Sequence, residues 1–130
     1  MSGQNPVVHF EMPYDDLDRV SAFYGKAFGW GMQGTGPEMG DYVLATTTET
    51  GANGRPTAPG AINGGFFANR PDGPPPYPSV VIAVGDLEQA MQSVTAAGGE
   101  VLGEPVDIPG VGRYVSFADS EGNRVSLLQP

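Results

Sequence analysis

The pattern of hydrophobic and polar residues repeats once along the chain, with a period of 70 residues. Residues 9–20 and 79–90 each contain a strand-like run, an Asp-Leu-acid step and then apolar residues at helical spacing. Each half of the chain therefore has the expected element order β-α-β-β-β. An internal repeat of this kind predicts two copies of one supersecondary unit.

Two helices are predicted from these blocks. The first starts near Asp15 or Asp16, because an aspartate can accept hydrogen bonds from free helical N–H groups, and it ends at Gly29. The second starts at Asp86 and ends at Gly98. Shorter strands are predicted after each helix, near residues 31–33, 41–46 and 61–68 in the first half and residues 100–102, 112–118 and 124–129 in the second.

The predicted fold class is α+β, with two βαβββ modules that form a curled mixed sheet around a cup and carry their helices outside. Module 1 is expected over about residues 7–68 and module 2 over about residues 79–129, with a proline-rich connector at residues 70–78. A module of about 65 residues with one helix makes a thin core. Both modules are therefore assigned to a single domain over residues 1–130.

Charge and composition exclude several classes of protein. Six Lys and Arg against fifteen Asp and Glu give a net charge of −9, whereas nucleic acids and anionic membranes are bound by clustered cations. The absence of Cys excludes a disulfide framework and a thiol nucleophile. The first residues lack the basic and apolar regions of a secretory signal, and the longest aliphatic run, Val80–Val84, is too short to span a membrane. We expect a cytoplasmic protein with neither a nucleic-acid nor a membrane partner.

Several motifs resemble the vicinal oxygen chelate superfamily, which contains glyoxalases, bleomycin resistance proteins and extradiol dioxygenases. The motifs are the strand that ends in an Asp-Leu step, Ala22-Phe23-Tyr24, Phe28-Gly29-Trp30, and Asp119-Ser-Glu-Gly-Asn123 before the last strand. The resemblance covers roughly residues 7–129, and residues 98–112 are similar to small single-domain members of actinobacterial type. One fold hosts many functions, so the resemblance implies the fold more specifically than the reaction.

Members of this superfamily that do metal chemistry place four ligands inside the cup, two from each module. The resemblance maps these positions onto His9, onto Asn63–Gly65, onto Ser79 and onto Ser126. His9 is the one histidine of the chain, and Glu11 lies on the same face of its strand. Zn, Ni, Mn or Fe would need several His or carboxylate ligands. No cofactor is therefore expected, with a divalent metal ion at His9 and Glu11 as the alternative.

The predicted ligand pocket is mainly apolar, with small hydroxyls and one arginine. Strand alternation turns Ser79 and Val81 toward the cup in the first strand of module 2, and Arg124 and Ser126 in its last strand. Aromatic residues are added as candidates for flat contacts with a ligand, with core packing as the alternative interpretation. The predicted pocket consists of His9, Glu11, Trp30, Tyr42, Asn63, Phe67, Ser79, Val81, Tyr114, Arg124 and Ser126.

His9 has three interpretations: a metal ligand, a general base near neutral pH, or a hydrogen-bonded residue in the wall of a pocket. Together with Glu11 it is the best candidate for catalysis, and whether the chain is an enzyme stays open. The sequence favours a protein that binds or sequesters a drug or metabolite without the full metal site of the superfamily. The alternative is a metal-dependent lyase or dioxygenase with a rearranged site around His9 and Glu11. A homodimer is expected because strand edges need cover.

Overall fold

A computed structural model describes residues 4–130 of the chain. The chain divides into two compact units. One unit is His9–Pro78, and the other is Ser79–Pro130 together with the described residues before His9. The assignment of both modules to one domain stays a prediction, and each module is described by itself below.

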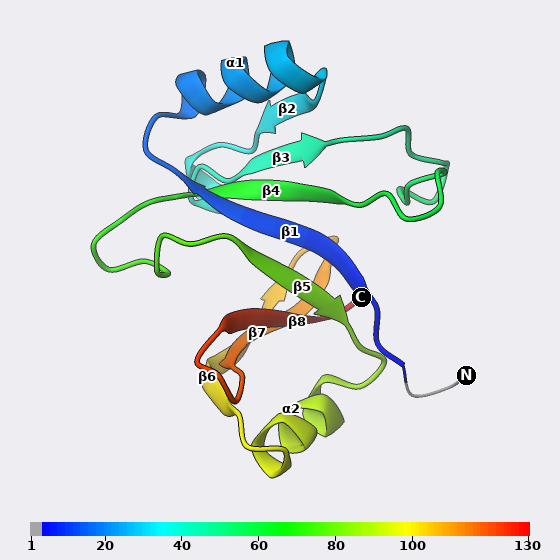
Figure 1. The fold of residues 1–130 in the computed structure, drawn as a ribbon, viewed down its shortest axis with the longest axis vertical. Coiled ribbons are helices and arrows are strands. Elements are labelled where there is room, and N and C mark those ends of the chain that lie inside the picture. Colours follow the sequence, from blue (N-terminus) through cyan, green and yellow to red (C-terminus); the bar gives the residue numbers. More distant parts are fainter. Residues whose placement is uncertain (1–3) are drawn as a thin grey trace. The chain divides into compact units, whose positions relative to one another are not determined.

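Both modules have the predicted βαβββ order (Figure 1), and the α+β fold class is confirmed. Module 1 contains β1 (Val7–Tyr14), α1 (Leu17–Phe28), β2 (Gly31–Gly34), the 3-10 helix η1 (Pro37–Met39), β3 (Val43–Thr46) and β4 (Asn63–Ala68). Module 2 contains β5 (Ser79–Ala83), α2 (Leu87–Ala96), β6 (Glu100–Ile108), β7 (Gly112–Ala118) and β8 (Arg124–Gln129). The first strand of each module pairs in parallel with its last strand, and the other pairs are antiparallel, in the orders β1-β4-β3-β2 and β5-β8-β7-β6.

Both helices begin at the aspartates predicted as their N-caps, Asp16 and Asp86. A carboxylate oxygen of Asp16 accepts a hydrogen bond from the Arg19 N–H at 3.0 Å, and Asp86 accepts from the Gln89 N–H at 3.1 Å. Both bonds satisfy N–H groups that have no partner within the helix. α1 ends at Gly29, which has a left-handed φ of 72° that glycine adopts without strain.

One face of each module's strands packs against its helix, which leaves the other face for different side chains. In module 1 the helix-side core contains alternate strand residues such as Phe10, Val43 and Phe66. His9 and Glu11 alternate with these residues and lie on the opposite face. In module 2 the residues Ile82, Val84, Val115, Phe117, Val125 and Leu127 pack around α2. Val81 and Ser126 alternate with these residues in β5 and β8 and therefore lie on the opposite strand face.

β6 is longer than the sequence predicts, because it continues to Ile108 rather than ending near Leu102. Its pairing with β7 is irregular between Leu102 and Val106, and Pro105 lies in this interval. Proline lacks the N–H that a regular ladder needs and is tolerated in outer strands and at bulges. The irregularity interrupts the alternation by which a strand is recognised.

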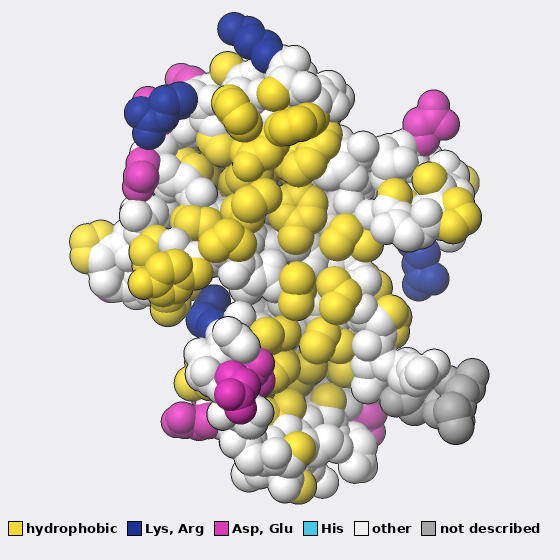
Figure 2. All heavy atoms as spheres, viewed as in Figure 1, with side chains coloured by type: hydrophobic (Ala, Val, Ile, Leu, Met, Phe, Trp, Pro, Cys, Tyr) yellow, Lys and Arg dark blue, Asp and Glu magenta, His cyan; other side chains and the backbone are white. Residues whose placement is uncertain are grey.

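α1 carries apolar side chains on its outer surface. Phe23 is 56% exposed and Phe28 is 63% exposed, and Figure 2 shows hydrophobic side chains gathered around this helix. Exposed apolar patches commonly mark contact sites for other molecules. The homodimer predicted from the sequence stays a prediction. Over residues 4–130, neither helix has the length and apolar character needed to cross a bilayer.

Candidate functional site

Three polar side chains of module 1 form a hydrogen-bonded cluster, His9–Tyr42–Glu11, which we call the polar triad. The Tyr42 hydroxyl lies 3.0 Å from His9 Nε2 and donates to Glu11 Oε2 at 3.1 Å. His9 and Glu11 come from β1, whereas Tyr42 directly precedes β3. All three residues are partly buried. The structure thus joins three predicted pocket residues, two of them 33 positions apart in sequence.

Gly65 makes room for the phenol ring of Tyr42. In the parallel pairing of β1 and β4, Gly65 is opposite Glu11, and Gly65 is buried. A Cβ atom added at Gly65 would overlap Tyr42 Oη and its ring carbons. Because glycine has no side chain, the ring of Tyr42 can lie across the strand and reach both β1 residues.

His9 is held as a neutral imidazole at neutral pH. Burial lowers the pKa of His9 below its ordinary value of 6.5, and the nearby Glu11 carboxylate opposes this with a smaller effect. The single phenolic proton of Tyr42 goes to Glu11, so the hydrogen bond between Tyr42 and His9 requires Nε2–H as the donor. Nδ1 is then the acceptor nitrogen of the ring. Over residues 4–130, His9 Nδ1 has no hydrogen-bond partner. No fully buried side-chain nitrogen or oxygen in this range lacks a partner, so Nδ1 is accessible from outside.

The pKa shift of His9 predicts how stability depends on pH. Between the lowered pKa of the folded chain and 6.5, the unfolded chain binds more protons at His9 than the folded chain does. The free energy of unfolding is therefore expected to fall as the pH decreases below 6.5, by at most about 1.4 kcal/mol per pH unit from this one group. Well above 6.5 the imidazole is neutral in both states and contributes no slope.

Urea unfolding of the wild type and of His9→Gln, measured from about pH 5 to 8, checks this expectation. The glutamine side chain keeps an N–H donor for Tyr42 but does not titrate. The carboxylates common to both proteins cancel in the difference between the two curves, which isolates His9. Parallel curves below pH 6.5 would contradict the expected protonation behaviour.

Module 2 carries a chain of three hydroxyl groups at the equivalent place. Ser126 is 0% exposed, and its Oγ lies 2.6 Å from the Tyr114 hydroxyl and 3.1 Å from Ser116 Oγ. Ser126 pairs with Val81 of β5 as Gly65 pairs with Glu11 of β1, so Ser126 and Gly65 are equivalent positions of the two modules. Ser116 is not among the pocket residues predicted from the sequence, although it alternates with the helix-side residues Val115 and Phe117 and so shares a strand face with Tyr114.

The residues present do not fit the four-ligand metal set that the superfamily resemblance implies. Two of the mapped positions lack a strong ligand, because Gly65 has no side chain and the Ser126 hydroxyl is engaged by two other hydroxyls. Within either module, over residues 4–130, no three His, Asp or Glu side chains converge so as to hold a metal ion. His9 and Glu11 alone fall short of the ligand number such ions prefer. The expected absence of a cofactor stays a prediction.

The remaining predicted pocket residues occupy different surroundings. Trp30 lies in the helix-side core, stacked on Tyr24 with ring centroids 4.7 Å apart, and so is separated from the face that carries His9. Asn63 shares the face of His9, but its Oδ1 accepts the Thr47 N–H at 2.8 Å, which secures the start of β4. The others are placed by strand position on the faces away from the helices: Phe67 in β4, Ser79 and Val81 in β5, and Arg124 in β8.

Comparisons with known proteins agree with this fold. The family described as Glyoxalase/Bleomycin resistance protein/Dioxygenase superfamily matches residues 7–127. CFP32 of Mycobacterium bovis, which its name assigns to the glyoxylases, is 39% identical over 67 residues, covering 52% of this chain and 26% of that protein. The anthracycline biosynthesis protein DnrV of Streptomyces peucetius is 31% identical over 123 residues, covering 87% of this chain and 42% of that protein. The chain thus spans less than half the length of these two relatives.

A solved structure supports the fold independently of close sequence similarity. A variant of Streptomyces coelicolor methylmalonyl-CoA epimerase, in complex with 2-nitronate-propionyl-CoA, aligns with a TM-score of 0.70 over 95% of both chains. The sequence identity is 17%. At this identity the similarity concerns the fold alone.

Proposed function

Because the chain belongs to the glyoxalase/bleomycin resistance protein/dioxygenase superfamily, we propose that it binds a small organic molecule on the face of module 1 that carries the polar triad, without the metal site of the superfamily. The observation that carries this proposal is the placement of Tyr42. Its ring covers Gly65 and its hydroxyl contacts both His9 and Glu11. The imidazole of His9 and the carboxylate of Glu11 are thereby joined to a phenol rather than to further metal ligands.

The chemistry of the triad favours a ligand with a hydroxyl donor on a flat ring. A neutral His9 with Nε2 donating to Tyr42 presents Nδ1 as an acceptor. Phe67 and Leu44 lie on the same strand face by alternation and add apolar surface. Pockets of this composition commonly bind organic molecules through apolar contacts, with a few polar groups that fix the orientation. The relative named for anthracycline biosynthesis makes a hydroxylated aromatic polycycle a suitable first ligand.

Titration with 2,6-dihydroxyanthraquinone tests the proposal, because its hydroxyl groups are too far from its carbonyl groups to bond internally and can donate to His9 Nδ1. We expect saturable binding that weakens about fivefold in Tyr42→Phe, because the phenol orients His9 and one hydrogen bond contributes about 1 kcal/mol. Tyr77→Phe is the matched control, since Tyr77 is 70% exposed in the connector. Binding that is undetectable, or that Tyr42→Phe and Tyr77→Phe change equally, would contradict the proposed site.

The alternative function is a metal-dependent lyase or dioxygenase that uses His9 and Glu11. Equilibrium dialysis of the purified protein against Zn, Ni, Mn and Fe separates the two functions. If the proposal holds, the wild type binds no stoichiometric metal ion. If the alternative holds, the wild type binds one metal ion per chain, and His9→Gln loses it. The predicted homodimer and cytoplasmic location belong to the same proposal and rest on the sequence alone.

A further inference from the structure

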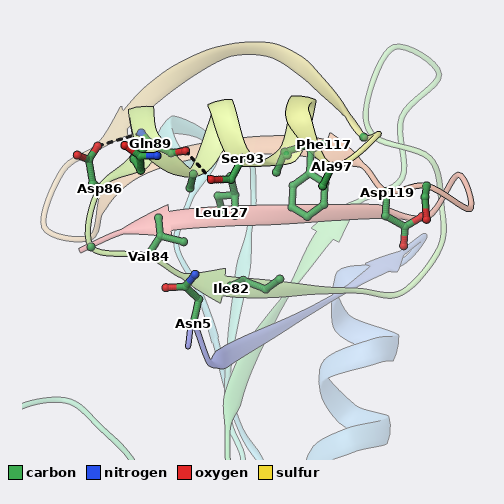
Figure 3. A pocket seen from close by; sticks show the side chains of 15 residues that line it. Asn5, Ile82, Val84, Asp86, Gln89, Ser93, Ala97, Phe117, Asp119 and Leu127 are labelled. Atoms are coloured by element: carbon green, nitrogen blue, oxygen red, sulfur yellow. Dashed lines mark hydrogen bonds between the residues drawn. The ribbon is translucent and has the colours of Figure 1, made fainter. Parts of the chain in front are cut away.

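Module 2 contains a groove that is separate from the polar triad and that the proposed function does not use. It has a volume of about 760 Å³ and runs between α2 and the strands β5 and β8 (Figure 3). Volumes of about 300–1,000 Å³ are typical of small-molecule sites. All of its lining residues belong to one compact unit.

The groove has an apolar floor and a polar rim. Ile82, Phe117 and Leu127 form part of the floor, and Figure 3 shows the ring of Phe117 beneath the end of α2. Asp86 and Asp119 lie toward opposite ends of the groove in the same view. A ligand that fills the groove would therefore contact apolar surface along its length and a carboxylate near either end.

The charged side chains that line the groove, Asp86 and Asp119, are both negative. Among residues 4–130, those that line it include no Lys, Arg or His, and neither Asp86 nor Asp119 is in a salt bridge there. Hydrogen bonds from the Asn123 side chain and from backbone N–H groups lower the pKa of Asp119, which keeps its carboxylate ionised. The chain as a whole carries a net charge of −9, so no long-range positive field offsets these carboxylates.

We propose that this groove binds an organic cation with an apolar body, an amine or quaternary ammonium compound whose rings or alkyl chain lie over Phe117 and Leu127. The ammonium group is placed beside Asp119, next to the Phe117 ring, or beside Asp86 at the other end. Ring faces attract cations as well as apolar groups. The charge and the apolar floor together select this class over anionic and over small polar ligands.

Two fluorescent probes with the same ring system test the selectivity by charge. Dansylcadaverine carries an ammonium group on its linker, and dansyl-6-aminohexanoate carries a carboxylate on a linker of similar length. We expect dansylcadaverine to show saturable fluorescence enhancement at one site, with an affinity at least about tenfold above that of the anionic probe. Equal affinity of the two probes would overturn the proposal.

Matched variants locate the site. Asp86→Asn with Asp119→Asn removes both groove charges. The Oδ1 atom of each asparagine can still accept the backbone N–H bonds that cap α2 and secure the turn, and only the bond from the Asn123 side chain to Asp119 Oδ2 is lost. We expect this variant to bind dansylcadaverine about threefold to tenfold more weakly. Glu100→Gln with Glu104→Gln removes the same net charge at exposed positions outside the groove and is expected to bind as the wild type does. An equal loss in both variants would show a response to net charge alone and overturn the proposal.

A steric variant separates this groove from the polar triad. Ala97 is exposed at the end of α2 and lines the groove near Phe117, so Ala97→Phe fills the groove with little effect on packing. It should abolish binding of dansylcadaverine, whereas Glu11→Gln should leave the binding unchanged. The opposite result would place the probe at the polar triad and overturn the proposal, while leaving the proposed function intact.

Discussion

Replacing Gly65 by alanine is expected to lower the free energy of unfolding by about 2 kcal/mol or more. The added Cβ would overlap the Tyr42 ring, and Gly65 is buried between paired strands, so the backbone has little freedom to move away. The backbone of Gly65 does not have a positive φ, so the expected destabilisation comes from the overlap and not from strain of the main chain. Equilibrium urea unfolding measures the change.

A double-mutant cycle with Tyr42→Ala tests this cause. When Tyr42 is truncated, the space beside Gly65 opens, and the alanine at position 65 is expected to be tolerated. The coupling energy should therefore be about 1–3 kcal/mol in favour of the double variant. Gly34→Ala is the matched control in the same module, because a Cβ added at Gly34 meets no atom within 4 Å. An undiminished loss from Gly65→Ala in the Tyr42→Ala background would show that the phenol is not the obstacle.

Replacing Ser126 by alanine is expected to lower the free energy of unfolding by about 1–3 kcal/mol. Ser126 is fully buried, and its hydroxyl contacts both the Tyr114 hydroxyl and Ser116 Oγ. Removal of Ser126 Oγ takes a hydrogen-bond partner from Ser116 Oγ, whose residue is only 5% exposed, and one contact from the partly buried Tyr114 hydroxyl. Buried polar groups that lose their partners are destabilising, because they bound water in the unfolded chain.

Thermal or urea unfolding of Ser126→Ala is best compared with Ser93→Ala. The Ser93 hydroxyl is exposed on α2 and donates to the Gln89 carbonyl oxygen of its own helix, so its removal should change stability little. Tyr114→Phe removes one of the two contacts of Ser126 and should have an intermediate effect. If Ser126→Ala were as stable as Ser93→Ala, the buried hydroxyl chain would not contribute to stability.

The local features of this protein follow from short stretches of its sequence. The starts of α1 and α2 at Asp16 and Asp86 are encoded in the few residues that supply the carboxylate and the N–H groups. The placement of Val125 and Leu127 on the helix side of β8 is also local, because successive side chains of a strand point to opposite faces. The repeat of 70 residues similarly predicts two modules with one element order.

The polar triad and the hydroxyl chain depend on contacts that only the folded chain makes. Tyr42 reaches His9 and Glu11 because β4 places Gly65 opposite Glu11 and leaves space for a ring, a register that no local pattern specifies. By residue type Trp30 is as good a pocket candidate as Tyr42, yet it lies in the core against Tyr24. Side chains far apart in sequence meet according to strand order and pairing register, and both arise from packing over the whole module.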